Sequence, residues 1–327
     1  MKMRLPWAAA VLIAVAAAAL RAQGAAALAP MLPAEFDTQT GQRIRVTMVA
    51  GGFVHPWSIV FPDARTILVA ERSGKIRMIR DGMLQPQPVW EAPPHPASDN
   101  GLQFLALHPQ FDQNHLVYLS YPKRGDKGTT LAISRGRFDG TIPPDNPFVG
   151  RAGAKPEIFT YGHRNGYGLA IHPQTGELWQ AEIGPLGGDE VNVLVAGHNY
   201  GWPVVSMGRN YTGTLASDQP WSRPGMDNPR MFWVPSISPS SILWYTGDKF
   251  PQWKNSLFVG ALTTKQLLRI SFNQPSQAEK REPLLASLNV RIRDVQQSPD
   301  GYIYVATEGA IRGDAADGMV LRLEPAN

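Results

Sequence analysis

Two arginines, Arg291 and Arg293, stand two positions apart in the segment VRIRD at residues 290–294. The alternating apolar pattern predicts a strand, and side chains two apart leave the same face of a strand. Two guanidinium groups on one face repel each other unless an anion lies between them, and arginine binds carboxylates in a bidentate manner. The pair therefore indicates either a site for an anionic ligand or two separate ion pairs with neighbouring acidic residues.

A second candidate is the loop EIGPLGGDEVN at residues 182–192, which is rich in glycine and acidic residues. The Gly184-Pro185 step opens the backbone, so that carbonyl oxygens can face a cation. Asp189 and Glu190 add the hard oxygen ligands that suit calcium. The alternative is a solvated acidic turn.

Two more polar loops precede predicted hairpins. Arg164 and Asn165 follow His163 in GHRN, and they could either contact a planar polar ligand or join two sheets by hydrogen bonds. We expect His163 to be a structural donor rather than a base. The remaining loop is SDNG at residues 98–101, which includes Asp99.

The elements that must position these loops are repeated hairpins. One pattern, an alternating strand, a Pro/Asp/Gly turn and a second alternating strand, recurs at residues 58–71, 105–121, 169–182, 242–262 and 295–308. Most copies are followed by a third strand with basic residues. Such repeats are typical of propeller blades, whose sheets bury their faces by stacking around an axis. We therefore predict an all-β propeller over residues 44–327, with an unpaired strand at residues 44–50 completing the last blade and closing the ring.

The N-terminal segment and the composition limit where and how the chain works. Residues 1–29 are predicted to be a cleaved signal peptide, because their apolar run, residues 7–20, is shorter than the roughly 20 residues that span a bilayer. Residues 30–43 are then a linker, and the location is periplasmic or secreted. Without the leader the chain has 28 basic and 27 acidic residues and no basic run, which indicates no nucleic-acid partner and no stable membrane insertion.

Six phrases identify a family resemblance. They are GHRN-x-x-GLA, E-x-GP-x-GGDE-x-N, GxNYGWP, PSI-x-PSS, YTGD-x-FP-x-W and RIRDV-x-x-SPDG. In this order, over about residues 54–325, they resemble the soluble pyrroloquinoline-quinone-dependent sugar dehydrogenases, the aldose and glucose/sorbosone dehydrogenase family. The resemblance implies a six-bladed propeller with the quinone lying over its axis.

The resemblance also implies roles for single residues. Arg164 and Asn165 would face the quinone oxygens at the reactive carbon, with Arg164 as the electrophile. The carboxylates of the quinone would pair with Arg291 and Arg293.

Calcium would be bound in two places. The carbonyls of Gly184 and Pro185 would hold the ion that bridges to the quinone, and Glu190 and Tyr200 would bind a further, structural ion. The reaction implied is oxidation of an aldose at the anomeric carbon to a lactone, with electrons passed to an external acceptor.

The sequence departs from the family pattern in one large respect. The segment LAISRGRFDG, residues 131–140, runs directly into residues 141–159, where the family has a whole further hairpin unit. The family's catalytic histidine lies on that unit, so the general base has no counterpart and five units remain. An alternative function is therefore a calcium-bound propeller that binds a sugar or a partner without turnover, and a defective, poorly folding chain is a third possibility.

Two smaller departures affect single positions. Asp99 stands where the family has a substrate-contacting Gln or Glu, and Phe104 replaces a glycine of the same loop. The family's quinone-binding lysine is Thr263 here, although Lys265 lies two residues further on and is a candidate for the same role.

Overall fold

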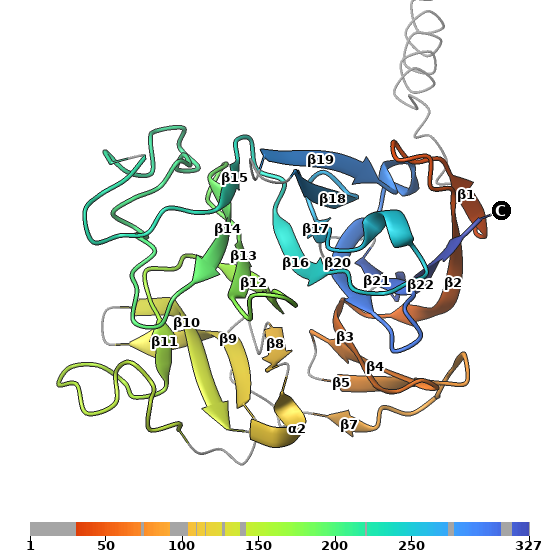
Figure 1. Cartoon of the computed structure of the whole chain (residues 1–327), viewed down its shortest axis with the longest axis horizontal. Helices are drawn as coiled ribbons and strands as arrows, with labels where there is room; N and C mark the ends of the chain where they lie inside the picture. Colours follow the sequence, from red (N-terminus) through yellow and green to blue (C-terminus); the bar gives the residue numbers. More distant parts are fainter. Residues whose placement is uncertain are drawn as a thin grey trace, which may run out of the picture.

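The described residues form five antiparallel β-sheets of four or five strands each. The computed structural model describes residues 31–72, 75–91, 104–108, 110–114, 116–125, 128–137, 142–219, 221–273, 278–308 and 316–326. Figure 1 shows the sheets around a ring, with the first strand of each nearest the middle. The predicted all-β propeller is confirmed, and the five sheets correspond to the five hairpin units.

Consecutive strands build each sheet. The first sheet contains β3 (Pro56–Asp63), β4 (Thr66–Glu71), β5 (Lys75–Arg80), β6 (Met83–Leu84) and β7 (Trp90–Glu91). The second contains β8 (Phe104–Leu107), β9 (Leu116–Gly125), β10 (Gly128–Arg137) and β11 (Ile158–Thr160), with the short helix α2 (Phe111–Asn114) between β8 and β9. The third contains β12 (Gly166–Ile171), β13 (Leu178–Glu182), β14 (Asp189–Leu194) and β15 (Met231–Trp233).

The last two sheets follow the same plan. The fourth contains β16 (Pro239–Trp244), β17 (Leu257–Ala261), β18 (Gln266–Asn273) and β19 (Ala278–Leu284). The fifth contains β20 (Arg291–Gln297), β21 (Ile303–Glu308), β22 (Gly318–Pro325), β2 (Ile44–Phe53) and β1 (Ala34–Phe36). Two 3-10 turns, η1 (Pro251–Trp253) and η2 (Ala286–Leu288), lie in connections.

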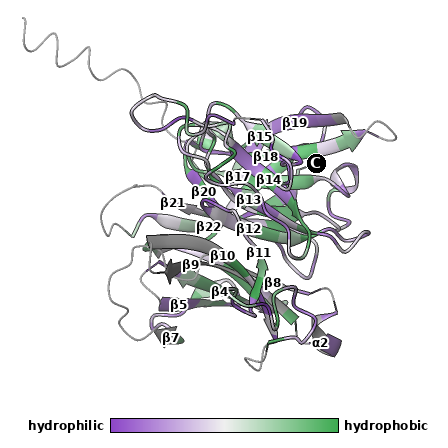
Figure 2. Cartoon of the chain, turned by 90° about the vertical axis from the view of Figure 1, so that its left-hand side faces the viewer, coloured by the Kyte–Doolittle hydropathy of each residue, from purple (hydrophilic) through white to green (hydrophobic). Residues whose placement is uncertain are grey.

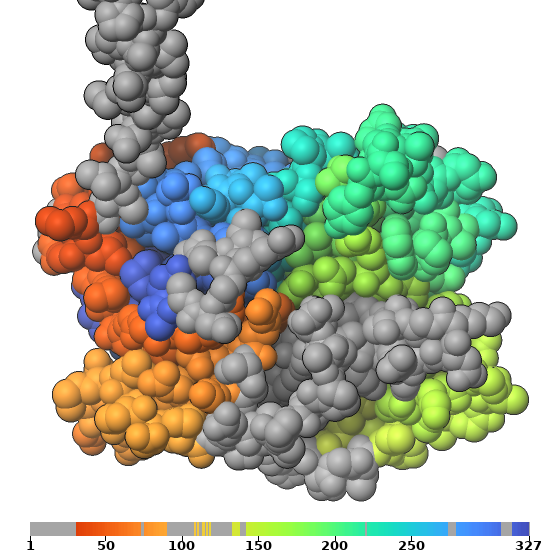
Figure 3. All heavy atoms as spheres, turned by 180° about the vertical axis from the view of Figure 1, so that it is seen from behind, coloured from red at the N-terminus to blue at the C-terminus, as the bar shows by residue number. Residues whose placement is uncertain are grey.

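The N-terminal strand completes the last sheet, as predicted. β2 pairs antiparallel with β22, so that Ile44 lies opposite Pro325. Figure 3 shows the N-terminal residues lying against the C-terminal strands. β1 lies within residues 30–43, the range predicted to be a linker. It pairs with β2, so part of this range belongs to the sheet. The signal-peptide prediction lies outside the described residues.

Alternating apolar residues let each sheet pack on its neighbours. In β13, Trp179 and Ala181 face the fourth sheet, whereas Leu178 faces the second. Similar clusters join the fourth and fifth sheets around Trp253, and the fifth and first around Phe53. Figure 2 shows the hydrophobic residues gathered along the strands, while the outer strand β19 is largely hydrophilic. Within the described part of the chain, the helices are too short or too polar to cross a bilayer.

The second sheet, at the sequence junction near residue 140, is closed by a strand that follows the junction. β11 pairs with β10, so the chain passes from Arg137 to Ile158 within a single sheet. Asn146 anchors the connection, because its side-chain amide donates to the carbonyls of Arg135, at 2.9 Å, and Pro156, at 3.1 Å. β11 is therefore the outer strand of this sheet.

Candidate functional site

The loops before β12 and after β13 enclose a small polar cavity of about 10 Å3. Space of this size suffices for about one water molecule or ion. The cavity is lined by Arg164, Glu182, Gly184, Gly188, Glu190, Tyr200, Trp202, Val205 and Ser206. Four of these residues, Arg164, Gly184, Glu190 and Tyr200, are sequence-predicted site residues, and the structure brings them together.

Glu182, which the sequence analysis did not single out, organises one wall of the cavity. Its carboxylate accepts the backbone N–H of Arg164 and lies 3.0 Å from Nδ1 of His163. His163 also contacts the Thr160 hydroxyl at 3.0 Å and is fully buried, so its predicted structural role agrees with its position. The arrangement fixes the GHRN loop and points Arg164 into the cavity, where its Nη1 donates to the carbonyl of Gly184 at 3.0 Å.

Glu190 lies directly opposite Glu182 in the β13–β14 ladder. Burial, together with the nearby charge of Glu182, raises the pKa of Glu190 to about 8, although Asn192 donates to its carboxylate at 3.1 Å. No lysine or arginine of the described residues forms an ion pair with Glu190. Two facing carboxylates on one small cavity therefore favour a cation there.

Tyr200 lines the cavity, and its phenol hydroxyl is already hydrogen-bonded within the protein. The hydroxyl donates to the carbonyl of Val193 at 2.6 Å and accepts the N–H of Val195 at 2.8 Å. Burial is the main cause that raises the pKa of Tyr200 to about 12, so the phenol stays protonated. A metal ligand at this position would be the main-chain carbonyl oxygen.

The acidic loop uses Asp189 differently from the expectation. The carboxylate of Asp189 accepts N–H groups from Gly184, Ile237 and Ser238 and a hydroxyl from Ser236. The expectation that Asp189 offers its oxygens to calcium is wrong, because those oxygens hold the loop that precedes β16 in place. Its pKa is nevertheless raised, since burial outweighs these bonds.

Gly184 is required by close packing of the loop. A Cβ at this position would lie 2.2 Å from the carbonyl oxygen of Gly187 and 2.5 Å from that of Gly188. We expect Gly184→Ala to lower the free energy of unfolding by about 2 kcal/mol, because the loop must move to relieve the overlap. Urea unfolding measures the change. Gly51→Ala is the matched control, since the nearest atom there is 3.5 Å away, and a loss equal to the control would contradict the packing argument.

The arginine pair forms a second cluster. Nε of Arg291, at 3.2 Å, and Nε of Arg293, at 2.7 Å, both donate to one oxygen of the buried Glu308. One protein carboxylate therefore lies between the two cations. The sequence suggested either an anionic ligand or two separate ion pairs, and in the structure both arginines share one acidic residue. One carboxylate leaves the pair with a net positive charge. Burial and the charge of Arg293 lower the pKa of Arg291.

Aromatic side chains connect the two clusters. The guanidinium of Arg293 lies 4.2 Å from the ring centre of Trp57, and that ring lies 6.0 Å from the ring of Tyr167. Ile183 packs against both rings, and its carbonyl accepts Nη1 of Arg164 at 2.9 Å. The cavity and the arginine pair are therefore neighbours at the end of the ring where the first strands begin.

The other predicted site residues have different positions. Asn165 lies in the same loop, and its carbonyl accepts the N–H of Ile183 at 2.9 Å. Lys265 occupies the β17–β18 turn and donates to Asn289 at 3.1 Å, two residues before Arg291. Pro185 lies against Gly208. Asp99 lies outside the described residues.

Some residues of the site were not predicted from the sequence. Three of the repeated phrases end in glutamate, at Glu71, Glu182 and Glu308. Each of these residues lies opposite the start of the first strand of its own sheet. This shared repeat position is the signal that could have identified Glu182 and Glu308.

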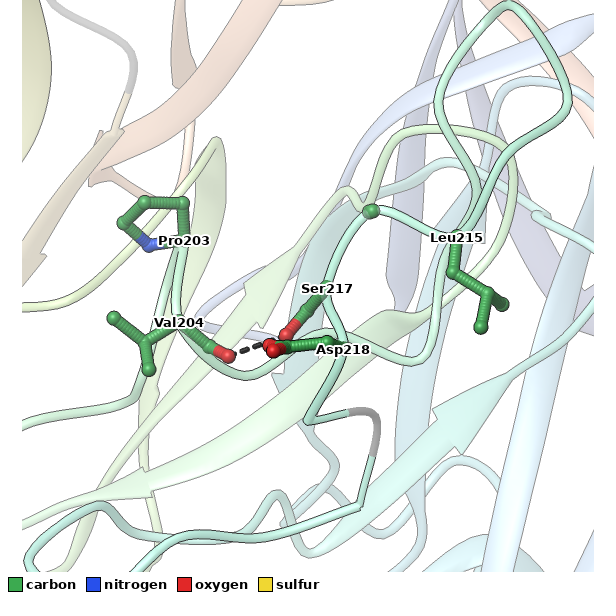
Figure 4. A pocket seen from close by; sticks show the side chains of 6 residues that line it. Pro203, Val204, Leu215, Ser217 and Asp218 are labelled. Carbon is green, nitrogen blue, oxygen red and sulfur yellow. Dashed lines mark hydrogen bonds between the residues drawn. The ribbon is translucent and has the colours of Figure 1, made fainter.

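A larger hollow lies beside the small cavity, on the long connection between β14 and β15. Its volume is about 520 Å3, and it is lined by Pro203, Val204, Leu215, Ala216, Ser217 and Asp218 (Figure 4). The Ser217 hydroxyl donates to the carbonyl of Val204 and holds two of its walls together. Segment 202–206 lines both spaces.

The donor sets fit calcium and an anionic planar cofactor. The cavity combines paired carboxylates with main-chain carbonyls, and the arginine pair carries surplus positive charge next to an aromatic ring. The described residues contain no group of three or more His, Asp or Glu side chains that could hold a metal ion.

Comparisons with known proteins agree with this arrangement. The Glucose / Sorbosone dehydrogenase model matches residues 53–139 and 135–316. The aldose sugar dehydrogenase YliI of Escherichia coli is 31% identical over 87% of this chain and 94% of its own length. Quinoprotein glucose dehydrogenase B of Acinetobacter calcoaceticus is 28% identical over 64% of this chain and 57% of its own length.

A solved structure is similar throughout. The apo form of the soluble aldose sugar dehydrogenase from Escherichia coli matches with a TM-score of 0.72, at 28% identity, over 86% of this chain and 100% of its own. The alignment with YliI spans 354 positions, which exceeds the 327 residues of this chain, so the relative has residues without counterpart here. The family model restarts at residue 135, next to the predicted missing unit. The chain therefore belongs to the Glucose / Sorbosone dehydrogenase family.

Proposed function

We propose that this chain oxidises an aldose at the anomeric carbon to a lactone in the periplasm, using pyrroloquinoline quinone and calcium, and passes the electrons to an external acceptor. The observation that carries the proposal is the contact between the Arg164 cavity and the Arg291–Arg293 pair through Ile183, Tyr167 and Trp57. The names of the relatives, an aldose sugar dehydrogenase and a quinoprotein glucose dehydrogenase, support the substrate class and the cofactor.

The residues of the two clusters would have different roles in binding and catalysis. Arg291 and Arg293 would hold the carboxylates of the quinone, and Lys265 lies close enough to the start of β20 to assist. At the other end, Arg164 and Asn165 would supply donors that stabilise negative charge as it develops on oxygen. When bound at these residues, the quinone would supply the acceptor for hydride from the sugar.

Main-chain oxygens would bind the metal ions. The carbonyls of Gly184 and Pro185 would hold the calcium next to the quinone, while Glu190 and the carbonyl of Tyr200 would hold the structural ion. Asp99 is the proposed substrate contact.

A second function, ligand binding without turnover, is favoured by one specific observation. The chain passes from β10 to β11 inside a single sheet, which supports the expectation from the resemblance that the unit with the family's catalytic histidine has no counterpart here. A sugar dehydrogenase needs a base for the hydroxyl proton, and loss of such a group lowers rates by about 100-fold to 10,000-fold. Cofactor binding does not require that base.

Dye reduction with a panel of aldoses distinguishes the two functions. The purified chain is loaded with calcium and quinone, and the product is identified by NMR. We expect dye reduction that yields a lactone and stops when calcium is chelated before loading. Quinone binding without dye reduction would instead support the second function.

A further inference from the structure

Glu308 lies at the centre of a buried network that the proposed chemistry does not yet use. It is 1% exposed, and its neighbour His55 is 4% exposed. One carboxylate oxygen accepts both arginine Nε groups, and the other lies against Nδ1 of His55. The three partners come from two sheets, because His55 precedes β3 whereas both arginines belong to β20.

The way in which Glu308 contacts the arginines leaves the ligand-binding atoms unused. Both arginines donate to Glu308 through Nε, so this carboxylate does not engage their terminal nitrogens. A hydrogen bond at Nε restricts rotation of the guanidinium, so that its terminal nitrogens keep a preferred direction. Trp57 supports the same geometry by covering the face of Arg293 at 4.2 Å.

The charges around Glu308 favour its ionised form. Burial raises the pKa of Glu308, but Arg293, His55 and Arg291 together outweigh it, and the pKa is lowered. Glu308 is therefore ionised whenever the arginines are in place. The equivalent glutamate of the third sheet, Glu182, likewise fixes a residue of the GHRN loop through its backbone N–H.

We propose that Glu308, held by His55, is a positioning residue that sets Arg291 and Arg293 for carboxylates of the quinone. The inference rests on the proposed function. We expect the orientation of the two arginines to affect quinone binding more than the negative charge of Glu308 does. Removing the negative charge of Glu308 alone would strengthen attraction for an anion, whereas releasing the two arginines would weaken its binding.

Calorimetric titration of pyrroloquinoline quinone at saturating calcium tests the proposal. We expect Glu308→Gln to weaken quinone binding about tenfold or more, because a neutral amide cannot accept from two cations and from His55 together. Glu308→Asp keeps the charge but shortens the side chain, and we expect intermediate weakening. If Glu308→Gln folds poorly, Glu308→Asp still tests the proposal.

Glu282→Gln is the matched control. Glu282 is equally buried and accepts Nε of Arg269 at 2.7 Å in the fourth sheet, away from the cavity. We expect this variant to lose stability and to bind the quinone as the wild type does. Tighter binding by Glu308→Gln with unchanged Glu308→Asp, or unchanged binding by both, would overturn the proposal. A wild-type chain that binds no quinone would instead overturn the proposed function, and this inference with it.

Discussion

Replacing Arg164 with alanine is expected to lower the rate of dye reduction about 100-fold or more, with the fold intact. The guanidinium lines the small cavity and reaches the carbonyls of Ile183 and Gly184, at 2.9 Å and 3.0 Å. A preorganised donor of this kind acts mainly on charge that develops in the transition state, and loss of one such donor has effects of this size. Initial rates with calcium and quinone present measure the change.

Arg151→Ala is the control for this substitution. Its guanidinium lies 5.3 Å from the ring centre of Phe148, as that of Arg164 lies 5.3 Å from Trp202, but it is exposed and outside the cavity. We expect the control to keep the wild-type rate. Equal rates for Arg164→Ala and wild type would show that Arg164 is not the electrophile.

The second large effect is the dependence of stability on pH and calcium at Glu190. The pKa of this carboxyl is about 8 in the folded chain, above its ordinary value of 4.5. Below pH 4.5 the group is protonated in both states and has no effect. Between pH 4.5 and 8 only the unfolded chain releases the proton, so the calcium-free protein loses stability as pH rises, by up to about 5 kcal/mol.

Calcium is expected to reverse this loss, because the proposed structural ion would bind the ionised carboxylate. We therefore expect calcium to stabilise the chain much more at pH 8 than at pH 5, as measured by urea unfolding with calcium or with chelator. Glu190→Gln should remove both the pH slope of this group and most of the calcium effect. Glu177→Gln, at an exposed turn of the same sheet, should leave both unchanged. A calcium effect that is equal at both pH values would contradict the assignment.

Periodic features of the sequence predicted the architecture well. The alternation within each hairpin unit fixes which side chains are buried, so the five sheets and the closing strand β2 could be derived from pattern alone. β1 was missed, because three residues, Ala34–Phe36, are too few for a periodic signal.

The site was predicted where short motifs carry it and missed where partners come from distant segments. Arg164, Gly184, Glu190 and Tyr200 come from short motifs and meet at one cavity, although the resemblance implied separate calcium sites for Gly184 and for Glu190 with Tyr200. Glu308 joins residues 55 and 293, which are far apart in sequence, and no local pattern states that contact.

Asp189 shows the opposite error. Its position in an acidic glycine-rich loop suggested a metal ligand, but composition does not reveal which donors reach a carboxylate. Four hydrogen-bond donors, three of them from residues 236–238, occupy its oxygens in the fold. Because residues 236–238 are far from Asp189 in the sequence, the sequence alone does not show that they compete with a metal ion for its oxygens.

The most direct test of the account is calorimetric titration of the wild-type chain with pyrroloquinoline quinone, in calcium and in chelator. We predict that one quinone binds per chain with calcium and that binding is much weaker without it. The loaded protein should also have a higher unfolding temperature. Absence of quinone binding by a folded, calcium-loaded chain would contradict it, and would mean that loss of one unit had destroyed the cofactor site.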